Sequence, residues 1–410
     1  MTYLDWASTS PPDAGILHEA AGVAADCYGN PSSSHALGTK AKAKLEEARA
    51  RLAGAISPSG AAAAAGASMA PRLLFTSGGT EADGIVLLAL LRQALNSRRD
   101  GSIKRLHVIA TEIEHAAVYE EALLLKALGI AVTFVAPESD GRVDPRKIGA
   151  AVEKDSALVA VMAVNNETGA IQRLPEIALA IAEAALSFGR PPPRFHVDAV
   201  QALGKTAFDP AASGATSAAF SAHKLRGPRG VGALWTAGVP QAGVPLEPLS
   251  LGGGQERGLR PGTENLQGAW AFAAAAARAQ SAFAGHAAHA SALEARLLDG
   301  LKHIPSALAL PLGRAAGDAR YSPYIMSAAF PGLSGEVLAR ALSDLGIAVS
   351  TGAACSSNSR RTGRRVMRAM GLSEELSLSA IRVSTGELSC EADIDAFLEA
   401  ASSAYRRLKT

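Results

Sequence analysis

The sequence predicts an α/β protein: a mostly parallel, seven-stranded sheet in a large domain, joined to a smaller α+β domain. The first observation is that short apolar runs alternate with helical patterns, which is typical of strand–helix–strand crossover units. The second is size, because 410 residues exceed one typical domain and a hydrophobic content of 48% can fill two cores. The seven apolar runs that predict the strands cover residues 72–75, 106–110, 131–135, 158–164, 194–197, 218–220 and 232–235.

Two further segments complete the expected organisation. Residues 57–70 are Ala-rich, lack an amphipathic pattern and are bracketed by prolines, so we expect an inserted surface loop. From residue 266 to about 301, Ala and Leu dominate with few helix breakers, which predicts long helices that link the two domains. The large domain is predicted at residues 16–280, and the small domain at residues 1–15 and 281–410.

Composition and charge exclude several classes of protein. With 40 Lys and Arg against 38 Asp and Glu, the net charge of +2 gives no global basic field of the kind that nucleic-acid-binding proteins show. No apolar run approaches the roughly 18 residues that span a bilayer. A strand predicted from Tyr3 leaves no room for a leader peptide. We therefore expect a cytoplasmic enzyme with a small-molecule substrate and no nucleic-acid or membrane partner.

The three cysteines, Cys27, Cys355 and Cys390, are odd in number and widely separated, without a C-x-x-C spacing. A disulfide framework or a zinc cluster is therefore not expected, and no metal site is predicted. We expect the thiols to be reduced. Two of them are interpreted as ordinary buried residues, and Cys390, near a predicted helix start, is assigned to that group.

The stretch most informative about chemistry ends in Lys224. This lysine closes a Ser-Ala-His-Lys motif and follows Asp198 and Gln201 by a little over twenty residues. Taken alone, Lys224 would be a solvated loop charge. Taken together, a lysine amine can hold an aldehyde as a Schiff base, and a carboxylate can keep a pyridine nitrogen protonated. The pairing therefore suggests pyridoxal 5'-phosphate as the cofactor.

Strand ends supply candidate groups for the phosphate and the ring of this cofactor. After the run at 72–75 a Gly pair opens a helix, so backbone N–H groups at the helix start, with Gly79 and Thr80, can hold a phosphate. A plain turn is the alternative for the Gly pair. His115 follows the run at 106–110 and can lie flat on a cofactor ring. An isolated histidine is more often a structural residue, which is the alternative here.

Other candidates follow the middle strands. Asn166 comes after a predicted strand, although two amides beside a glycine could also form an Asx turn. If the sheet order places Asn166 beside Asp198, both lie at the carboxyl edge, where open α/β sheets bind ligands. Gln201 can donate to the ring hydroxyl, and Ser221 and His223 can reach the phosphate.

Six motifs occur in a defined order along the chain. They are YLD at 3–5, GNPSSSH at 29–35, VNNE at 164–167, HVDAVQ at 196–201, SAHK at 221–224 and GGQERGLRPGT at 253–263. Together they resemble the cysteine desulfurases, which are class-V aminotransferase-like enzymes of pyridoxal phosphate fold type I. The resemblance covers residues 3 to about 397 and is to the branch with a long cysteine loop. It departs from the family pattern at residues 6–10, WASTS, and in the Ala-rich segment.

The resemblance implies a role for each motif residue. Lys224 is implied to bond covalently to the cofactor, and Asp198 to pair with its pyridine nitrogen. Gln201 is implied to contact the ring oxygen, and His115 to stack on the ring. Those implied to hold the phosphate are Gly79, Thr80, Ser221 and His223, with Thr263 from the neighbouring subunit of a homodimer. The substrate carboxylate is implied to bind Asn166 and Arg382.

Physical arguments that do not depend on the resemblance also support roles for Arg382 and Cys355. A planar guanidinium is suited to bidentate capture of a carboxylate, with a structural salt bridge as the alternative for Arg382. Cys355 lies among small residues, which predicts an accessible loop, and an exposed thiol there can attack the sulfur of a bound cysteine. The arginines that follow are interpreted first as a solvated helix face, and second as groups that stabilise a thiolate or dock an acidic acceptor. They are Arg360, Arg361, Arg364, Arg365 and Arg368.

We therefore predict a homodimeric enzyme that converts L-cysteine to L-alanine and leaves the sulfur as a persulfide on Cys355. The acceptor would be an iron–sulfur scaffold or another sulfur-acceptor protein. A selenocysteine lyase, or another class-V lyase, would use the same cofactor groups without an obligatory thiol. A sulfur-transfer assembly partner without turnover is the alternative from another class, and the presence of every expected catalytic residue disfavours it.

Overall fold

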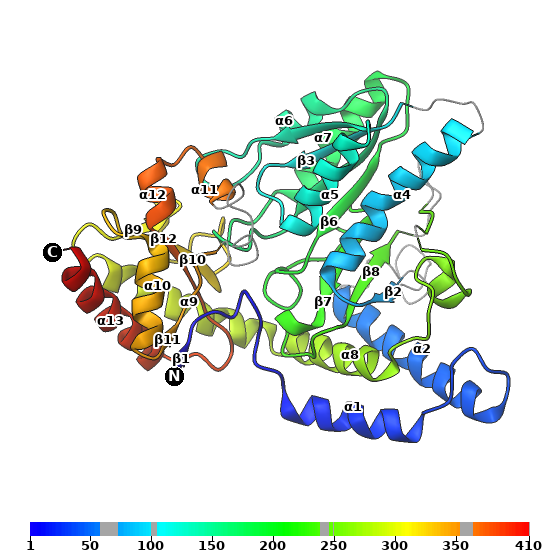
Figure 1. Ribbon diagram of the computed structural model, residues 1–410, viewed down its shortest axis with the longest axis horizontal. Helices are drawn as coiled ribbons and strands as arrows, with labels where there is room; N and C mark the ends of the chain where they lie inside the picture. The colour runs from blue at the N-terminus through cyan, green and yellow to red at the C-terminus, as the bar shows by residue number, and fades with distance from the viewer. Residues whose placement is uncertain (58–72, 100–104, 238–245, 249, 353–363, 410) are drawn as a thin grey trace.

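The computed structural model describes residues 1–57, 73–99, 105–237, 246–248, 250–352 and 364–409 (Figure 1). Cys355 lies outside the described residues, and so does the loop predicted for the Ala-rich segment beyond Ser57. Ser57 itself is buried, and its hydroxyl donates to Asp209 Oδ2 at 2.5 Å.

A seven-stranded sheet forms the centre of the larger part of the molecule. β8 runs antiparallel to both of its neighbours, β2 and β7, and the other neighbouring strands are parallel. The predicted, mostly parallel seven-stranded sheet is therefore confirmed. In sheet order the strands are β2 (Leu73–Thr76), β8 (Gly232–Thr236), β7 (Ser217–Ser221), β6 (Arg194–Asp198), β5 (Ser156–Met162), β3 (His107–Thr111) and β4 (Ala131–Val135).

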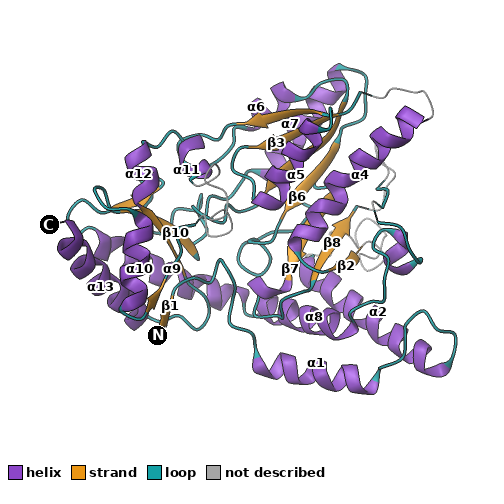
Figure 2. Cartoon of the chain, viewed as in Figure 1, coloured by secondary structure: helices purple, strands orange, loops and turns teal. Residues whose placement is uncertain are grey.

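Helices cover both faces of this sheet (Figure 2). Successive strand residues point to opposite faces, so Leu73 and Phe75 join one apolar cluster while Leu74 joins another. The helices of the first cluster are α1 (Ala14–Asp26), α2 (Ala36–Ile56), α6 (Pro145–Ala151), α7 (Leu174–Ser187) and α8 (Leu266–Ser281). Those of the second are α4 (Gly79–Arg99) and α5 (Ala116–Ala127). The result is a three-layer arrangement in which every strand of the sheet except the edge strand β4 is almost completely buried.

A second core forms where the two ends of the chain meet. Leu4 packs with Leu297, Phe330 and Phe397 in one buried cluster. The strands around it are β1 (Thr2–Tyr3), which pairs with β11 (Ile347–Ala348), and the antiparallel set β9 (Leu308–Leu310), β10 (Ile325–Ala329) and β12 (Ala380–Ser384). The helices are α9 (Phe283–Leu301), α10 (Gly335–Asp344), α11 (Arg365–Ala369), α12 (Glu374–Ser379) and α13 (Glu391–Lys409). The exact domain boundaries, 15/16 and 280/281, stay a prediction.

Arg364, just before α11, and Arg365, within it, do not lie on the solvated helix face that the sequence suggested. Arg364 is buried and donates to the carbonyl of Ala380 at 2.8 Å, while the Arg365 guanidinium donates to the carbonyls of Glu112 and Glu114. Helical spacing misled the interpretation because α11 packs inward on two sides: Val366 joins the cluster of the large sheet, and Met367 packs with Leu310 and Ala329. The surface interpretation holds for Arg368, which pairs with Glu374 at 2.6 Å on the outside. Arg360 and Arg361 lie outside the described residues.

The cysteine assignments need one correction. Cys27 is buried, as expected of an ordinary core residue, but Cys390 is exposed. Cys390 directly precedes α13, where its backbone N–H donates to Asp393 Oδ2 at 2.9 Å. At this helix start the thiol of Cys390 faces solvent.

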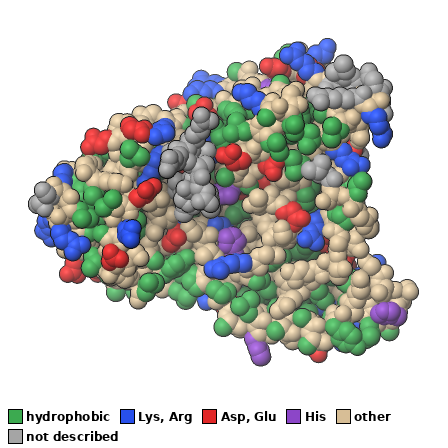
Figure 3. Space-filling view, viewed as in Figure 1, with side chains coloured by type: hydrophobic (Ala, Val, Ile, Leu, Met, Phe, Trp, Pro, Cys, Tyr) green, Lys and Arg blue, Asp and Glu red, His purple; other side chains and the backbone are tan. Residues whose placement is uncertain are grey.

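On the face shown in Figure 3, acidic and basic side chains are interspersed, in keeping with the small net charge. Among the helices that the structure describes, none combines the length and apolarity that crossing a bilayer requires. Within the same residues, no group of three or more His, Cys, Asp or Glu side chains is placed to hold a metal ion.

Candidate active site

The predicted site residues gather at the carboxyl edge of the large sheet. Asp198 is the last residue of β6, Ser221 is the last residue of β7, and Lys224 ends the short 3-10 helix η2 (Ala222–Lys224) that follows. His115 directly precedes α5, after β3. Because the carboxyl ends of parallel strands meet at one edge, residues far apart in sequence share this site.

Asp198, His115 and Lys224 form the electrostatic centre of the site. Burial raises the pKa of the Asp198 carboxyl, and the nearby His115 and Lys224 oppose that rise. Burial lowers the pKa of the His115 imidazole below its usual value. The His115 Nδ1 atom accepts from the Ala117 backbone N–H at 3.2 Å, so the neutral ring carries its proton on Nε2. A donor N–H of His115 is therefore available on the other side of the ring.

The Lys224 amine is held by the beginning of the chain. Its Nζ donates to the carbonyl oxygens of Ala7 at 2.6 Å and Ser8 at 2.7 Å. Gln201 Nε2 donates to the same Ala7 oxygen at 2.9 Å, and His223 Nδ1 lies 3.1 Å from the Thr9 hydroxyl. These contacts involve backbone carbonyls and one hydroxyl, so the departure from the family pattern at residues 6–10 leaves them in place.

Gly79 and Ser221 line a compact turn at the start of α4. A Cβ atom on Gly79 would lie 2.5 Å from Val200 Cγ2, so only glycine fits beside the Asp198 turn. The Ser221 side chain is buried, whereas Thr80 is exposed. Free backbone N–H groups at a helix start attract anions, which is the chemistry that a phosphate needs.

His223 is set to be neutral. Burial, followed by the charges of Lys224 and Lys205, lowers the pKa of the His223 imidazole to about 3. At neutral pH its ring can therefore serve a phosphate as a hydrogen-bond donor but adds no positive charge.

Arg382, on β12, belongs to the same cluster from the other core. Its Nη1 donates to the Asn166 carbonyl at 2.7 Å, and its Nη2 donates to Asp5 Oδ1 at 2.9 Å and to the Ser8 hydroxyl at 2.6 Å. The guanidinium is almost completely buried, yet Nε has no hydrogen-bond partner among the described residues. A buried donor of this kind fits an anionic ligand.

The Asx turn considered for the 164–169 segment is made by Asn165. The Asn165 Oδ1 accepts from the Thr168 backbone N–H at 2.8 Å, and its Nδ2 donates to the Ile113 carbonyl. Asn166 takes no part in that turn, and its backbone carbonyl accepts a hydrogen bond from Arg382.

Thr263 is exposed on the single chain. Its segment is anchored next to β2, because Glu256 in η3 (Gln255–Gly258) forms a buried, two-pronged ion pair with Arg49, at 2.7 and 2.9 Å. Glu256 Oε2 also accepts from the Phe75 backbone N–H at 3.0 Å. The segment that leads to Thr263 is therefore tied to β2 at Glu256. Cys355 lies outside the described residues.

Sequence reasoning missed two features of the site. One is Lys205, whose Nζ donates to Gln201 Oε1 at 3.3 Å. Its spacing of four residues from Gln201 in a turn was an available signal. The other is the contact of Asp5 and Ser8 with Arg382, at the far end of the chain; the YLD motif includes Asp5 but does not indicate this partner.

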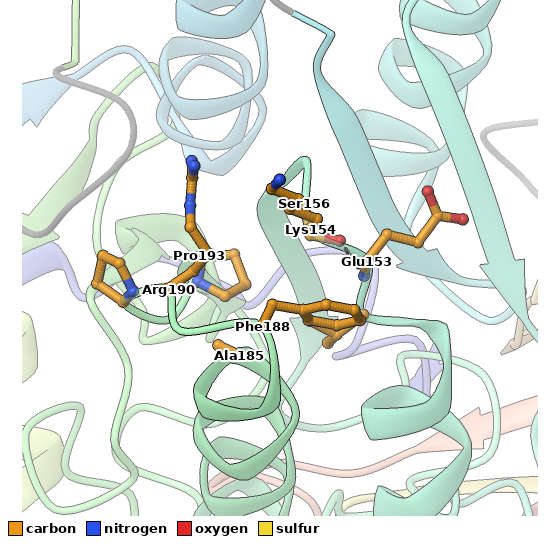
Figure 4. A pocket seen from close by; sticks show the side chains of 9 residues that line it. Glu153, Lys154, Ser156, Ala185, Phe188, Arg190 and Pro193 are labelled. Atoms are coloured by element: carbon orange, nitrogen blue, oxygen red, sulfur yellow. Dashed lines mark hydrogen bonds between the residues drawn. The ribbon is translucent and has the colours of Figure 1, made fainter.

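A separate pocket of about 270 Å³ lies at the end of the sheet where β5 and β6 begin (Figure 4). Ser156, at the start of β5, and Pro193, just before β6, line it together with Phe188. The site residues follow the carboxyl ends of the same strands, so this pocket is not part of the candidate site.

The family model described as Aminotransferase class-V matches residues 2–397, nearly the whole chain. The chain belongs to the class-V aminotransferase family. The protein named Cysteine desulfurase IscS of Anaeromyxobacter dehalogenans (strain 2CP-C) is 36% identical over 411 residues, covering 99% of this chain and 93% of that protein. A solved structure of a NifS-like protein is 31% identical with a TM-score of 0.84, covering 99% of both chains. A structure of SspA in complex with cysteine is 26% identical with a TM-score of 0.73, covering 95% of this chain and all of that one.

These similarities confirm two sequence predictions. The class-V family is the one that the ordered motifs resembled, and the solved NifS-like relative shares the fold over the full length. The fold of this class-V family member is therefore the type I fold of pyridoxal phosphate enzymes.

Proposed function

We propose that this class-V family member is a pyridoxal phosphate-dependent cysteine desulfurase. It would convert L-cysteine to L-alanine and leave the sulfur as a persulfide on Cys355, for an iron–sulfur scaffold or another acceptor. The observation that carries the proposal is the meeting of Lys224, Asp198 and Arg382 at one sheet edge: an amine, a buried carboxylate and a guanidinium with an unpaired buried donor. Relatives that bear the cysteine desulfurase name support it.

The residues present fit the cofactor. Lys224 would hold its aldehyde, Asp198 would face its pyridine nitrogen, and Gln201 would contact its ring oxygen. Gly79 and Ser221, at the start of α4 and the end of β7, leave a compact turn lined by backbone donors for its phosphate, with Thr80 and His223 beside it. When bound, pyridoxal 5'-phosphate withdraws electrons from an attached amino acid.

The protein side chains would then handle protons and charge. The Ala7 and Ser8 carbonyls orient the Lys224 amine, which is placed to hold and return a proton. His115 presents its Nε2 proton to the site, because its Nδ1 is occupied by the backbone. Arg382, through Nε, and Asn166 would hold the substrate carboxylate.

The cofactor proposal is tested by a visible absorption spectrum of the purified protein with pyridoxal 5'-phosphate, before and after cysteine is added. We expect a visible band that changes on addition of cysteine, with alanine as the product. A protein that retains no cofactor, or that forms no alanine, would refute the proposal.

Arg382→Ala is expected to weaken cysteine binding while cofactor binding survives. A hydrogen bond to a charged group contributes about 1.5–3 kcal/mol, which corresponds to an increase in KM of about 10- to 150-fold. Steady-state kinetics on cysteine, with cofactor content measured in parallel, checks this. Arg382→Lys is the matched control, because it keeps the charge but loses the planar fork and should recover only part of the binding. Unchanged cysteine kinetics would mean that Arg382 serves only its salt bridge with Asp5.

We also propose that the active site is shared across a two-fold homodimer. Thr263 is exposed on the single chain, so it is available to a second subunit, and the Arg49–Glu256 pair ties the start of its segment to β2. Sedimentation velocity should show a dimer at working concentration. Thr263→Val should keep the dimer but weaken cofactor binding about 10- to 150-fold, the effect of one lost hydrogen bond to a charged phosphate. A fully active monomer would contradict this arrangement.

A further inference from the structure

Lys205 is a lysine of the site that the proposed chemistry does not use. It follows Gly204 in the turn that begins at Asp198. Gly204 has a φ of +68°, and a Cβ atom there would lie 2.8 Å from the Ala279 Cβ, so glycine is required where this turn packs on α8. The Lys205 backbone N–H donates to the Ala202 carbonyl at 3.0 Å. The turn therefore places the Lys205 side chain alongside that of Gln201.

The contact between the two side chains is directional. The Lys205 amine donates to Gln201 Oε1 at 3.3 Å, and Gln201 Nε2 donates to the Ala7 carbonyl at 2.9 Å. A protonated lysine amine only donates, and a carbonyl oxygen only accepts. Both partners therefore demand the same orientation of the Gln201 amide, with its oxygen toward Lys205 and its NH2 group toward the Lys224 side of the site.

The surroundings of the Lys205 amine are unfavourable for a charge. Burial, with added repulsion from Lys224 and Arg382, lowers the pKa of the Lys205 amine to about 7. Placing a third cationic group beside Lys224 and Arg382 costs free energy, and an apolar side chain would avoid that cost. A buried lysine that is kept in spite of this cost is expected to have a function in the site.

We propose that Lys205 is a positioning residue, which fixes the Gln201 amide so that its NH2 group faces the ring oxygen of the cofactor. This inference rests on the proposed cofactor. Without Lys205, the Ala7 carbonyl alone would hold the amide, and a rotated amide would present its oxygen to the ring oxygen. The two oxygens would then repel each other.

The test is a double-mutant cycle read out by cofactor binding in the absence of cysteine. Lys205→Met removes the donor at nearly constant length, and Gln201→Leu removes the amide. We expect Lys205→Met to weaken pyridoxal 5'-phosphate binding about 2- to 13-fold, the effect of one neutral hydrogen bond, and to shift the visible absorption maximum. In the Gln201→Leu background, Lys205→Met should have little further effect.

Two controls make the outcome decisive. Lys205→Arg keeps a hydrogen-bond donor at this position, adds no acceptor, and should restore most of the cofactor binding. Lys302→Met removes an exposed lysine and should not change cofactor binding. Effects of Lys205→Met and Gln201→Leu that simply add, or a Lys205→Arg variant as weak as Lys205→Met, would overturn the proposal. A wild-type protein that binds no pyridoxal 5'-phosphate would instead refute the proposed function.

Discussion

Lys224→Ala is expected to abolish both the visible absorption band of the cofactor complex and the conversion of cysteine to alanine. Lys224 is the amine that the Ala7 and Ser8 carbonyls aim into the site, and it would both hold the cofactor and move a proton. A single positioned proton-transfer group contributes about 10²- to 10⁴-fold to a rate, and the covalent attachment is lost in addition. Absorption spectra and alanine formation measure the two losses separately.

The control for this variant is Lys302→Ala, which removes an exposed lysine on the surface. It should match the wild type in both measurements. Retention of the band and of turnover by Lys224→Ala would show that the wrong lysine has been assigned. Lys205 would then be the first alternative, because its amine lies in the same cluster.

The fold was predictable because its signals are local. Each strand of the large sheet is a short apolar run. Neighbouring residues such as Leu73 and Leu74 belong to different apolar clusters, because helices cover both faces of the sheet. Asp198, Ser221 and His115 follow such runs directly, so their meeting at one edge follows from parallel pairing. A motif that ends a strand was therefore a sound guide to the site.

The site contacts that no local sequence pattern predicts are those made by residues at the beginning of the chain. Leu4 packs in the core that the last helix closes, which carries Asp5 and Ala7 into the site. The Lys224 and Gln201 side chains there bind the carbonyl of Ala7, and a backbone carbonyl is the same in every residue type. Neither periodicity nor composition can predict such a pairing.

Charge patterns were the weakest guide. Arg364 and Arg365 have the spacing of a solvated helix, yet one is buried and the other donates to two carbonyls of the larger core. Their solvation depends on which surface the short helix α11 meets, and this is set by the packing of the two cores. The exposed position of Cys390 has the same origin, since a helix start can face solvent or core with the same sequence.

Cys355→Ser is expected to bind cofactor and cysteine normally while releasing almost no sulfide and carrying no persulfide. In the proposed step the Cys355 thiolate attacks the substrate sulfur, so that a sulfur–sulfur bond forms as the carbon–sulfur bond breaks and the alanine carbon takes up a proton. A free thiol is only a few per cent thiolate at neutral pH, and a hydroxyl is far less ionised, so serine cannot replace it. Lys224, Asp198 and Arg382 are unchanged in this variant. Mass spectrometry after one turnover, with sulfide assayed in parallel, gives the result.

The exposed thiol of Cys390 makes a matched control necessary, because it could collect sulfur non-specifically. Cys390→Ser should therefore keep full turnover and a persulfide on Cys355, whereas buried Cys27 should stay unmodified in both variants. With selenocysteine as the substrate, Cys355→Ser should lose much less activity, since the weaker carbon–selenium bond breaks without a protein nucleophile. Full cysteine turnover by Cys355→Ser would favour the thiol-independent lyase, and a persulfide mapped to Cys27 or Cys390 in the wild type would move the sulfur-accepting role away from Cys355.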